Sequence, residues 1–192
     1  DVSLYTALYG PRFAVPSSDM FAMSLGFEGA PVDDMLAFHV VFGKTVPDIS
    51  LNAVANLGYA AGRFGAPVYP GDTLRATSKV IGLKENSNGK TGVVYVHSVG
   101  VNQRDEAVLD YIRWVMVKKR DLDAPAPETV IPDLPAFVAE EDLVIPEGLE
   151  MAAFDTLLSG SAMVWDDYEA GEKIDQRRIS ASHGQCSRGR GG

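Results

Sequence analysis

The sequence is poor in cysteine, in histidine and in basic side chains, and it has no long apolar run. Among 192 residues there is one cysteine, Cys186, and there are three histidines. A single cysteine excludes a disulfide framework and a cysteine-based metal site, which is typical of proteins in a reducing compartment. The sequence contains no stretch of 18 apolar residues and no charged-then-apolar leader, so it favours neither membrane insertion nor secretion. We therefore expect a cytoplasmic protein.

The shortage of basic residues limits the partners of the chain. Lysine and arginine number 17 against 26 acidic residues, which gives a net charge of −9. A nucleic-acid-binding protein needs a basic face that neutralises phosphates, so we do not expect that class. Negative net charge does not exclude a small anionic ligand, because a local basic pocket can outweigh it.

Proline divides the chain into parts. Residues 121–150 hold five of the eleven prolines, which predicts an extended linker. Residues 1–120 are dense in apolar side chains and read as a folded domain. Residues 151–175 contain a second apolar patch and the segment Trp165–Ile174. Residues 176–192 are rich in Arg, Ser and Gly, which predicts a disordered tail, and we interpret this abrupt change as an artificial ending.

The folded domain is expected to begin with helices. Asp1 is a candidate cap for a short helix to Tyr9, and Ser17 or Ser18 for a second one that Gly26 ends. The third covers residues 31–43. Pro31 and two aspartates, Asp33 and Asp34, suit its N-terminus, where free N–H groups favour carboxylates. Because few side chains between Met35 and Phe42 are polar, we expect a largely buried helix that ends at Gly43.

Four long strands should follow, at residues 49–59, 73–83, 91–103 and 107–119. Asn86–Gly89 joins the middle pair with a tight-turn signal. In the last strand the apolar residues Val108, Ile112, Trp114 and Met116 alternate with others, and we expect them to form its apolar face. A buried helix followed by a meander of long strands predicts an α+β hotdog fold, in which a curved antiparallel sheet wraps a central helix. The alternative is an undefined α+β domain.

Three groups of segments resemble the MaoC-like dehydratases. The first is Gly65–Leu74, a strand–turn–strand pattern in which Pro70-Gly71 turns and Asp72 is a candidate cap. The second runs from Phe21-Ala22 through Gly26-Phe27 to Ala30–Val32. The third combines residues 38–59, 86–95 and 113–117, and it resembles mesaconyl-CoA hydratases (β-methylmalyl-CoA dehydratases). This resemblance covers nearly all of residues 1–120.

The resemblance implies the first half of a double-hotdog hydro-lyase. Such an enzyme adds water reversibly across the double bond of a branched C5 enoyl-CoA, without a metal or redox cofactor. An acyl-CoA is the implied substrate, and a second hotdog module or another copy of the chain the implied partner. Trp165–Ile174 resembles the first strand of that second module. Without these parts an uncovered strand edge should promote association.

The catalytic aspartate and histidine of this family, five residues apart, fall on Pro11 and Pro16 here. Proline exchanges no proton, so the resemblance implies that this half shapes the acyl pocket while the second half carries catalysis. Two alternatives remain open, which are a non-catalytic acyl-CoA-binding protein and a hotdog thioesterase that uses Asp33 or Asp34.

Four residues are candidates for the pocket and its rim. Asp33 and Asp34 face the thioester if the helix start does so in this fold, although helix-terminal charges are the commoner role. His39 is either a core histidine or a pocket residue. Arg63 is a candidate contact for a CoA phosphate, or else a solvated arginine at a strand end. We expect His97, in the middle of a strand, to be structural.

Overall fold

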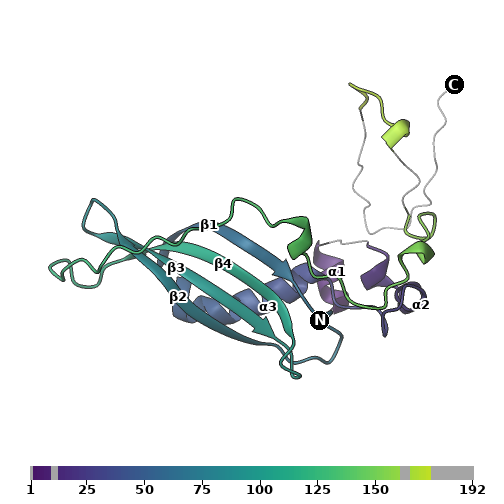
Figure 1. Cartoon of the computed structure of the whole chain (residues 1–192), viewed down its shortest axis with the longest axis horizontal. Helices are drawn as coiled ribbons and strands as arrows, with labels where there is room; N and C mark the ends of the chain where they lie inside the picture. Colours follow the sequence, from purple (N-terminus) through teal and green to yellow (C-terminus); the bar gives the residue numbers. More distant parts are fainter. Residues whose placement is uncertain (1, 10–12, 161–164, 174–192) are drawn as a thin grey trace.

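The computed structural model describes residues 2–9, 13–160 and 165–173. Its helical elements before the sheet are α1 (Val2–Tyr9), the 3-10 turn η1 (Val15–Ser17), α2 (Asp19–Ser24), α3 (Asp34–Thr45) and the π-helical turn η2 (Val46–Ser50). The strands are β1 (Ala53–Phe64), β2 (Arg75–Glu85), β3 (Thr91–Val101) and β4 (Ala107–Lys118). Figure 1 shows α3 lying lengthwise along the sheet, with α1 and α2 near one end. This arrangement confirms the predicted hotdog fold.

The caps of α2 and α3 follow the predictions. The Ser18 side chain accepts a hydrogen bond from the Phe21 N–H at 3.3 Å, and Gly26 just beyond α2 has a φ of +96°. Asp33 caps α3, with Oδ1 accepting from the Met35 N–H at 2.9 Å. Both helices therefore begin where a side-chain oxygen satisfies an otherwise free N–H.

The central helix is longer and less buried than predicted. It does not end at Gly43 but runs to Thr45 and continues into η2. Only one stripe, formed by Ala37, Val41 and Thr45, is buried, whereas Met35 and Val40 are 48% and 41% exposed. The expectation of a largely buried helix was wrong because the sheet covers one side of α3 only.

The sheet is antiparallel with the order β1-β4-β3-β2. Strands β2, β3 and β4 form the expected meander, and the Gly89 N–H donates to the Asn86 carbonyl at 2.9 Å in their first turn. The predicted simple meander is wrong for β1, which pairs with β4 and not with its successor β2. Three register shifts along β1 and one in each of the other two pairings mark irregularities that bend and twist the strands.

The core lies between α3 and the inner face of the sheet. Val41 is fully buried against Gly100 of β3, where a Cβ atom would come within 2.6 Å of the valine. On β4 the buried side chains are Val108, Leu109, Tyr111, Arg113 and Val115, whereas Ile112, Trp114 and Met116 are half-buried. Of the predicted apolar face only Val108 is fully buried, because the alternate residues Tyr111 and Arg113 are the ones that contact Phe38 and Thr45 of α3.

The connector, residues 121–150, contains one 3-10 turn, η3 (Glu140–Asp142), and one isolated bridge at Val130 as its only regular elements. It returns along the domain from the far end of the sheet to the end that carries α1 and α2 (Figure 1). Beyond it lie η4 (Met151–Ala153) and η5 (Trp165–Asp167). Trp165 lies in η5 and is 87% exposed, so the strand that we expected there is absent from the described residues. A strand needs a hydrogen-bonded neighbour, and this segment has none among the described residues.

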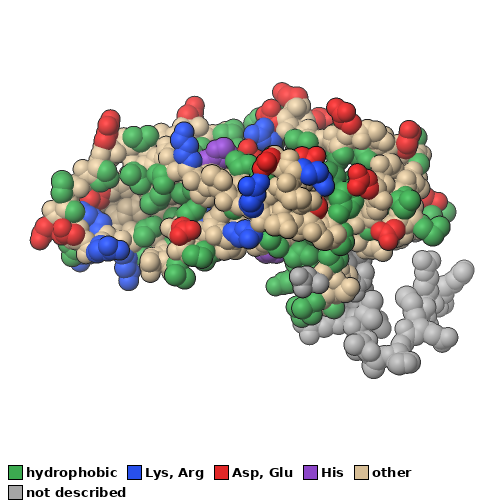
Figure 2. All heavy atoms as spheres, turned by 90° about the horizontal axis from the view of Figure 1, so that it is seen from below, with side chains coloured by type: hydrophobic (Ala, Val, Ile, Leu, Met, Phe, Trp, Pro, Cys, Tyr) green, Lys and Arg blue, Asp and Glu red, His purple; other side chains and the backbone are tan. Residues whose placement is uncertain are grey.

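The surface is of mixed charge. In Figure 2 acidic side chains are spread along the rim of the visible face, and basic side chains near its middle lie beside acidic ones. Within the ranges that the structure describes, no helix has the length and apolarity that a membrane span requires.

Candidate functional site

A cavity of about 330 Å³ opens at the N-terminal end of α3. Its walls are mostly apolar and come from the segment before α2, the start of α3, the end of β1 and the connector. The residues that line it are Phe13, Val15, Pro16, Phe27, Pro31, Val32, Asp33, Asp34, Met35, Phe64, Gly65, Pro67, Val144 and Pro146. A concave apolar site with a few convergent polar groups is the usual form of a small-ligand pocket.

Backbone contacts fix Asp33 in the wall of this cavity. The Val32 N–H donates to the Val68 carbonyl at 2.6 Å, which ties the start of α3 to the proline-rich turn before β2. Asp33 itself is 9% exposed and accepts the Met35 N–H. The helix start is therefore capped from within, so this N–H group is not free to polarise a thioester carbonyl.

Asp34 is the second carboxylate of the cavity, and it keeps contact with solvent. Desolvation by the surrounding protein raises the pKa of Asp34, and the negative charge of Asp33 raises it further. None of the described residues that line the cavity is basic. The site therefore disfavours a ligand group that carries negative charge.

Pro16, the position to which the resemblance assigns the family histidine, lies in η1 and lines the cavity. Pro11, the position of the family aspartate, lies outside the described residues. The apolar proline ring thus lines the cavity at the position to which the resemblance assigns the histidine. No histidine replaces it among the described residues of the wall.

His39 is neither a core histidine nor a residue of this cavity. It lies on the exposed flank of α3, where its ring stacks on Tyr9 of α1 with ring centroids 6.2 Å apart. His39 lies five positions after Asp34, and at about 100° per position this turns its side chain roughly 140° around the helix. A helix cannot present both residues to one pocket.

Arg63 is half-buried near the end of β1, one residue before Phe64 and Gly65 of the cavity wall. Alternation along the strand directs it away from the cavity, to the face on which its register partner Asp110 lies. On that face the His97 Nε2 lies 2.6 Å from Asp110 Oδ1, which accords with a structural histidine. Arg63 is thus next to the cavity but not part of it.

Asp72 joins the loops that support the cavity. Its Oδ2 accepts the Tyr69 N–H at 2.8 Å, which confirms the predicted cap, and its Oδ1 accepts from Gln103 at 2.5 Å. Burial by itself raises the pKa of Asp72, but these two hydrogen bonds and the charge of Arg104 outweigh it and lower the pKa below its usual value. The charged form of Asp72 therefore stabilises the turn that holds Val68.

Arg113 lies at the other end of α3 and is fully buried. Its Nη2 donates to Thr45 Oγ1 at 2.9 Å, and its guanidinium lies 4.4 Å from the Phe42 ring centroid. Burial lowers the pKa of Arg113, against the opposing effect of Tyr111 and Tyr59. We assign it a structural role, because a positive charge at the C-terminal end of a helix is favourable there.

Sequence reasoning missed the part of the cavity that comes from the connector. Val144 and Pro146 line it, although the prolines indicated only an extended segment. It also missed Phe13 and Phe27, which flank α2 in the chain. Only the resemblance, which places an active-site loop before the central helix, pointed to this region.

A model of mesaconyl-CoA hydratase matches residues 14–190 of the chain. The chain belongs to the mesaconyl-CoA hydratase family. It is 69% identical over 175 residues to the β-methylmalyl-CoA dehydratase of Chloroflexus aurantiacus and 63% identical over 173 residues to the mesaconyl-CoA hydratase of Cereibacter sphaeroides. The matched range extends into residues 176–192, which we interpreted from composition as an artificial ending.

The chain spans about half the length of the curated relatives it matches. These alignments cover 91% and 90% of this chain but 50% of each relative. Among solved structures, a MaoC-domain dehydratase of Chloroflexus aurantiacus has a TM-score of 0.82 at 69% identity, with 91% of this chain and 50% of that one covered. A double-hotdog protein of Mycobacterium tuberculosis, at 24% identity and a TM-score of 0.62 over 73% of this chain and 46% of that one, shares the fold.

Proposed function

We propose that this chain is the first, non-catalytic half of a hydro-lyase that acts on mesaconyl-CoA or β-methylmalyl-CoA. The reaction is the reversible addition of water across the double bond of a branched C5 enoyl thioester. The first half supplies binding surface and a pairing partner, and the second supplies the acid and the base. Membership of the family and the half-length match to two such enzymes support this assignment.

The observation that carries the non-catalytic role is the composition of the cavity at the start of α3. Hydration needs one group that removes a proton from water and one that delivers a proton to carbon. Pro16 offers neither, and the Asp33 carboxylate is engaged by the Met35 N–H. Asp34 alone cannot supply both functions, so the chemistry is assigned to the other module.

We place the uncharged part of the acyl group in this cavity. Its walls are apolar, and a volume of about 330 Å³ accommodates a short branched chain. The free carboxylate of a mesaconyl group would point away from Asp33 and Asp34, because like charges repel in a desolvated site. Arg63, next to the rim, is our candidate for a CoA phosphate, since a guanidinium pairs well with phosphate oxygens.

The second module is proposed to cover β1 and the open flank of α3. Strand β1 is an edge of the sheet, and its exposed side chains include Val54, Leu57 and Tyr59 at 49%, 44% and 48%. Phe38 and Phe42 of α3 lie beside Tyr59, with ring centroids 6.3 and 6.4 Å from it, and continue this apolar surface. An apolar edge of this kind is a ready template for pairing with another strand.

Titration calorimetry with mesaconyl-CoA and with free CoA tests the proposal. We expect the chain to bind mesaconyl-CoA at least tenfold more tightly than free CoA, with no loss of the enoyl thioester on incubation. Arg63→Gln should weaken both ligands alike, whereas Lys90→Gln, in the far β2–β3 turn, should weaken neither. Equal affinity for both ligands would refute acyl binding, and release of free CoA from the thioester would favour the thioesterase instead.

A further inference from the structure

The connector supplies part of the cavity wall. Val144 and Pro146 line the cavity, while its remaining walls come from residues 13–67. Val144 is 57% exposed, as expected for a residue that covers a site with one side and faces solvent with the other. A chain segment far away in sequence thus determines how much room the cavity has.

The connector is attached firmly just after these residues. The Glu150 N–H donates to the Leu25 carbonyl at 2.9 Å. Gly148 packs so closely on Gly26 that a Cβ atom on Gly26 would overlap the Gly148 carbonyl. The Phe154 ring then meets the buried Phe21 edge-on, with centroids 5.3 Å apart. These contacts fasten the connector to α2 and to the turn that follows it.

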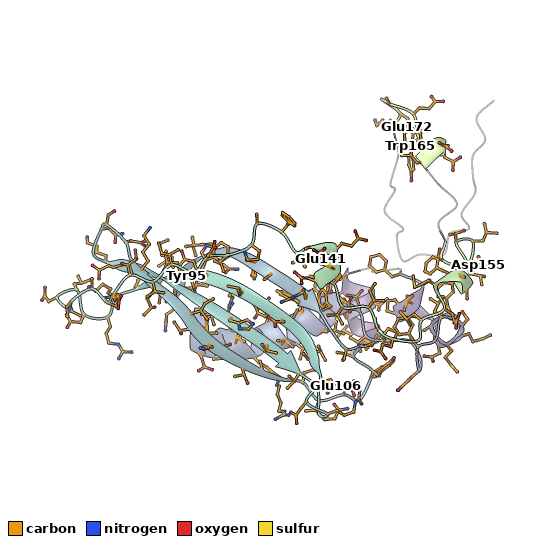
Figure 3. The ribbon with its side chains drawn as sticks, viewed as in Figure 1. Tyr95, Glu106, Glu141, Asp155, Trp165 and Glu172 are labelled. Carbon is orange, nitrogen blue, oxygen red and sulfur yellow. The ribbon has the colours of Figure 1, made fainter. Side chains whose placement is uncertain are left out.

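A second attachment lies before the wall. Leu83 and Val130 exchange two backbone hydrogen bonds, of 2.9 and 2.8 Å. Between the two attachments, the backbone hydrogen bonds of residues 131–147 within the described chain are all local. The Asp142 N–H donates to the Ala139 carbonyl and the Leu143 N–H to the Glu140 carbonyl, both at η3. Figure 3 shows the same course: Glu141 lies over the middle of the domain, and Asp155 lies at its α2 end. A segment held at both ends and free between them is a strap.

We propose that this strap closes the cavity and that Val144 and Pro146 set the size of the acyl group that it accepts. The inference rests on the proposed function, in which the cavity receives an acyl group. One methylene more or less in an apolar pocket changes affinity by roughly tenfold or more. A wall residue on the strap is therefore sufficient to choose between short acyl chains.

Affinities for a series of acyl-CoAs from two to eight carbons test the size rule. Val144→Ala should move the preferred length upwards by one or two carbons, and Val144→Phe should move it downwards, each by about tenfold in relative affinity. Phe137→Ala is the matched control, because this connector residue is 76% exposed and outside the cavity. It should leave the series unchanged.

Limited proteolysis of the ligand-free chain tests the attachment. Phe154→Ala should speed cleavage within residues 131–147 by about tenfold, since it removes one fastening, and Phe137→Ala should not. Unchanged cleavage in Phe154→Ala would overturn the strap. If the unaltered chain binds acyl-CoAs but the Val144 variants share its length preference, the size rule is wrong while the proposed function stands. If the unaltered chain binds no acyl-CoA, both are wrong.

Discussion

Asp72 shows how one half-buried carboxylate supports the cavity from outside it. It lies in the turn whose Val68 holds the start of α3, and hydrogen bonds from Tyr69 and Gln103 keep it charged. The sequence pointed to its role as a cap, because aspartate after Pro-Gly often closes a turn. The link to Gln103 was invisible, since nothing local in sequence joins residues that lie 31 positions apart.

Asp72→Asn should destabilise the fold by about 1–2 kcal/mol at pH 7. Because the pKa of Asp72 is lowered in the folded state, its stabilising effect is complete above the ordinary value near 4 and disappears as pH falls through the folded pKa. The difference between the two proteins should therefore shrink towards pH 3. Urea unfolding at both pH values measures it, with Asp105→Asn as an exposed control. An equal penalty at both pH values would contradict the assignment.

The charge of Asp34 is expected to control which acyl-CoA ligands bind. Asp34→Asn should strengthen binding of an acyl-CoA with a free carboxylate several-fold and leave a neutral acyl-CoA of equal size unchanged, because a repulsive charge is removed. Asp48→Asn, in η2 at the far end of α3, serves as the control. Calorimetric titration with both ligands measures the two affinities, and an equal gain in affinity for both ligands would show that charge is not the cause.

At the scale of elements, the contact between α3 and β3 depends on a glycine. A side chain at Gly100 would press on Val41, whereas Gly43 has nothing within 4 Å of a built Cβ atom. Gly100→Ala should therefore destabilise the fold by about 1–3 kcal/mol through overpacking. Gly43→Ala should stabilise it by about 0.5–1 kcal/mol through helix propensity. Thermal unfolding of both variants measures this, and a loss in Gly43→Ala would show that Gly43 is constrained after all.

The positions of the strands were largely predictable from the sequence, but which side of each strand faces the core was not. Alternation located β3 and β4 almost to the residue, because long antiparallel strands leave a strong pattern. It did not show that Arg113 is buried, because the apolar Ile112, Trp114 and Met116 lie on the opposite face of the strand. The pairing of β1 with β4 depends on the path of the sheet around α3, which no local pattern encodes. Gly43 misled in the same way, since it lies inside α3 and does not end it.

At the scale of the molecule, the open flank of β1 and α3 should drive association. We expect the isolated chain to form dimers or larger species at micromolar concentration. Leu57→Asp should shift these towards the monomer, because it charges the exposed edge, while Leu122→Asp, at an even more exposed residue of the connector, should not. Size-exclusion chromatography with light scattering reports the mass. A monomeric unaltered chain would show that this flank needs no partner.

The candidate site was predictable only in part, because some of its walls depend on contacts between segments that are distant in sequence. The helix start with Asp33 and Asp34 follows from local chemistry, and the place of Pro16 followed from the resemblance. Val144 and Pro146 come from a segment that folds back over the domain, and its course is decided by contacts at Leu83 and Leu25. Such long-range contacts are properties of the whole molecule.

The central claim is that this chain binds and a second module catalyses. Hydration of mesaconyl-CoA should be monitored as the loss of enoyl-thioester absorbance. The three samples are this chain, the second half of the Chloroflexus aurantiacus relative, and the two combined. We expect no turnover by this chain alone and turnover by the combination. Hydration by this chain alone would contradict the central claim, and loss of that activity in Asp34→Asn would make Asp34 the catalytic group.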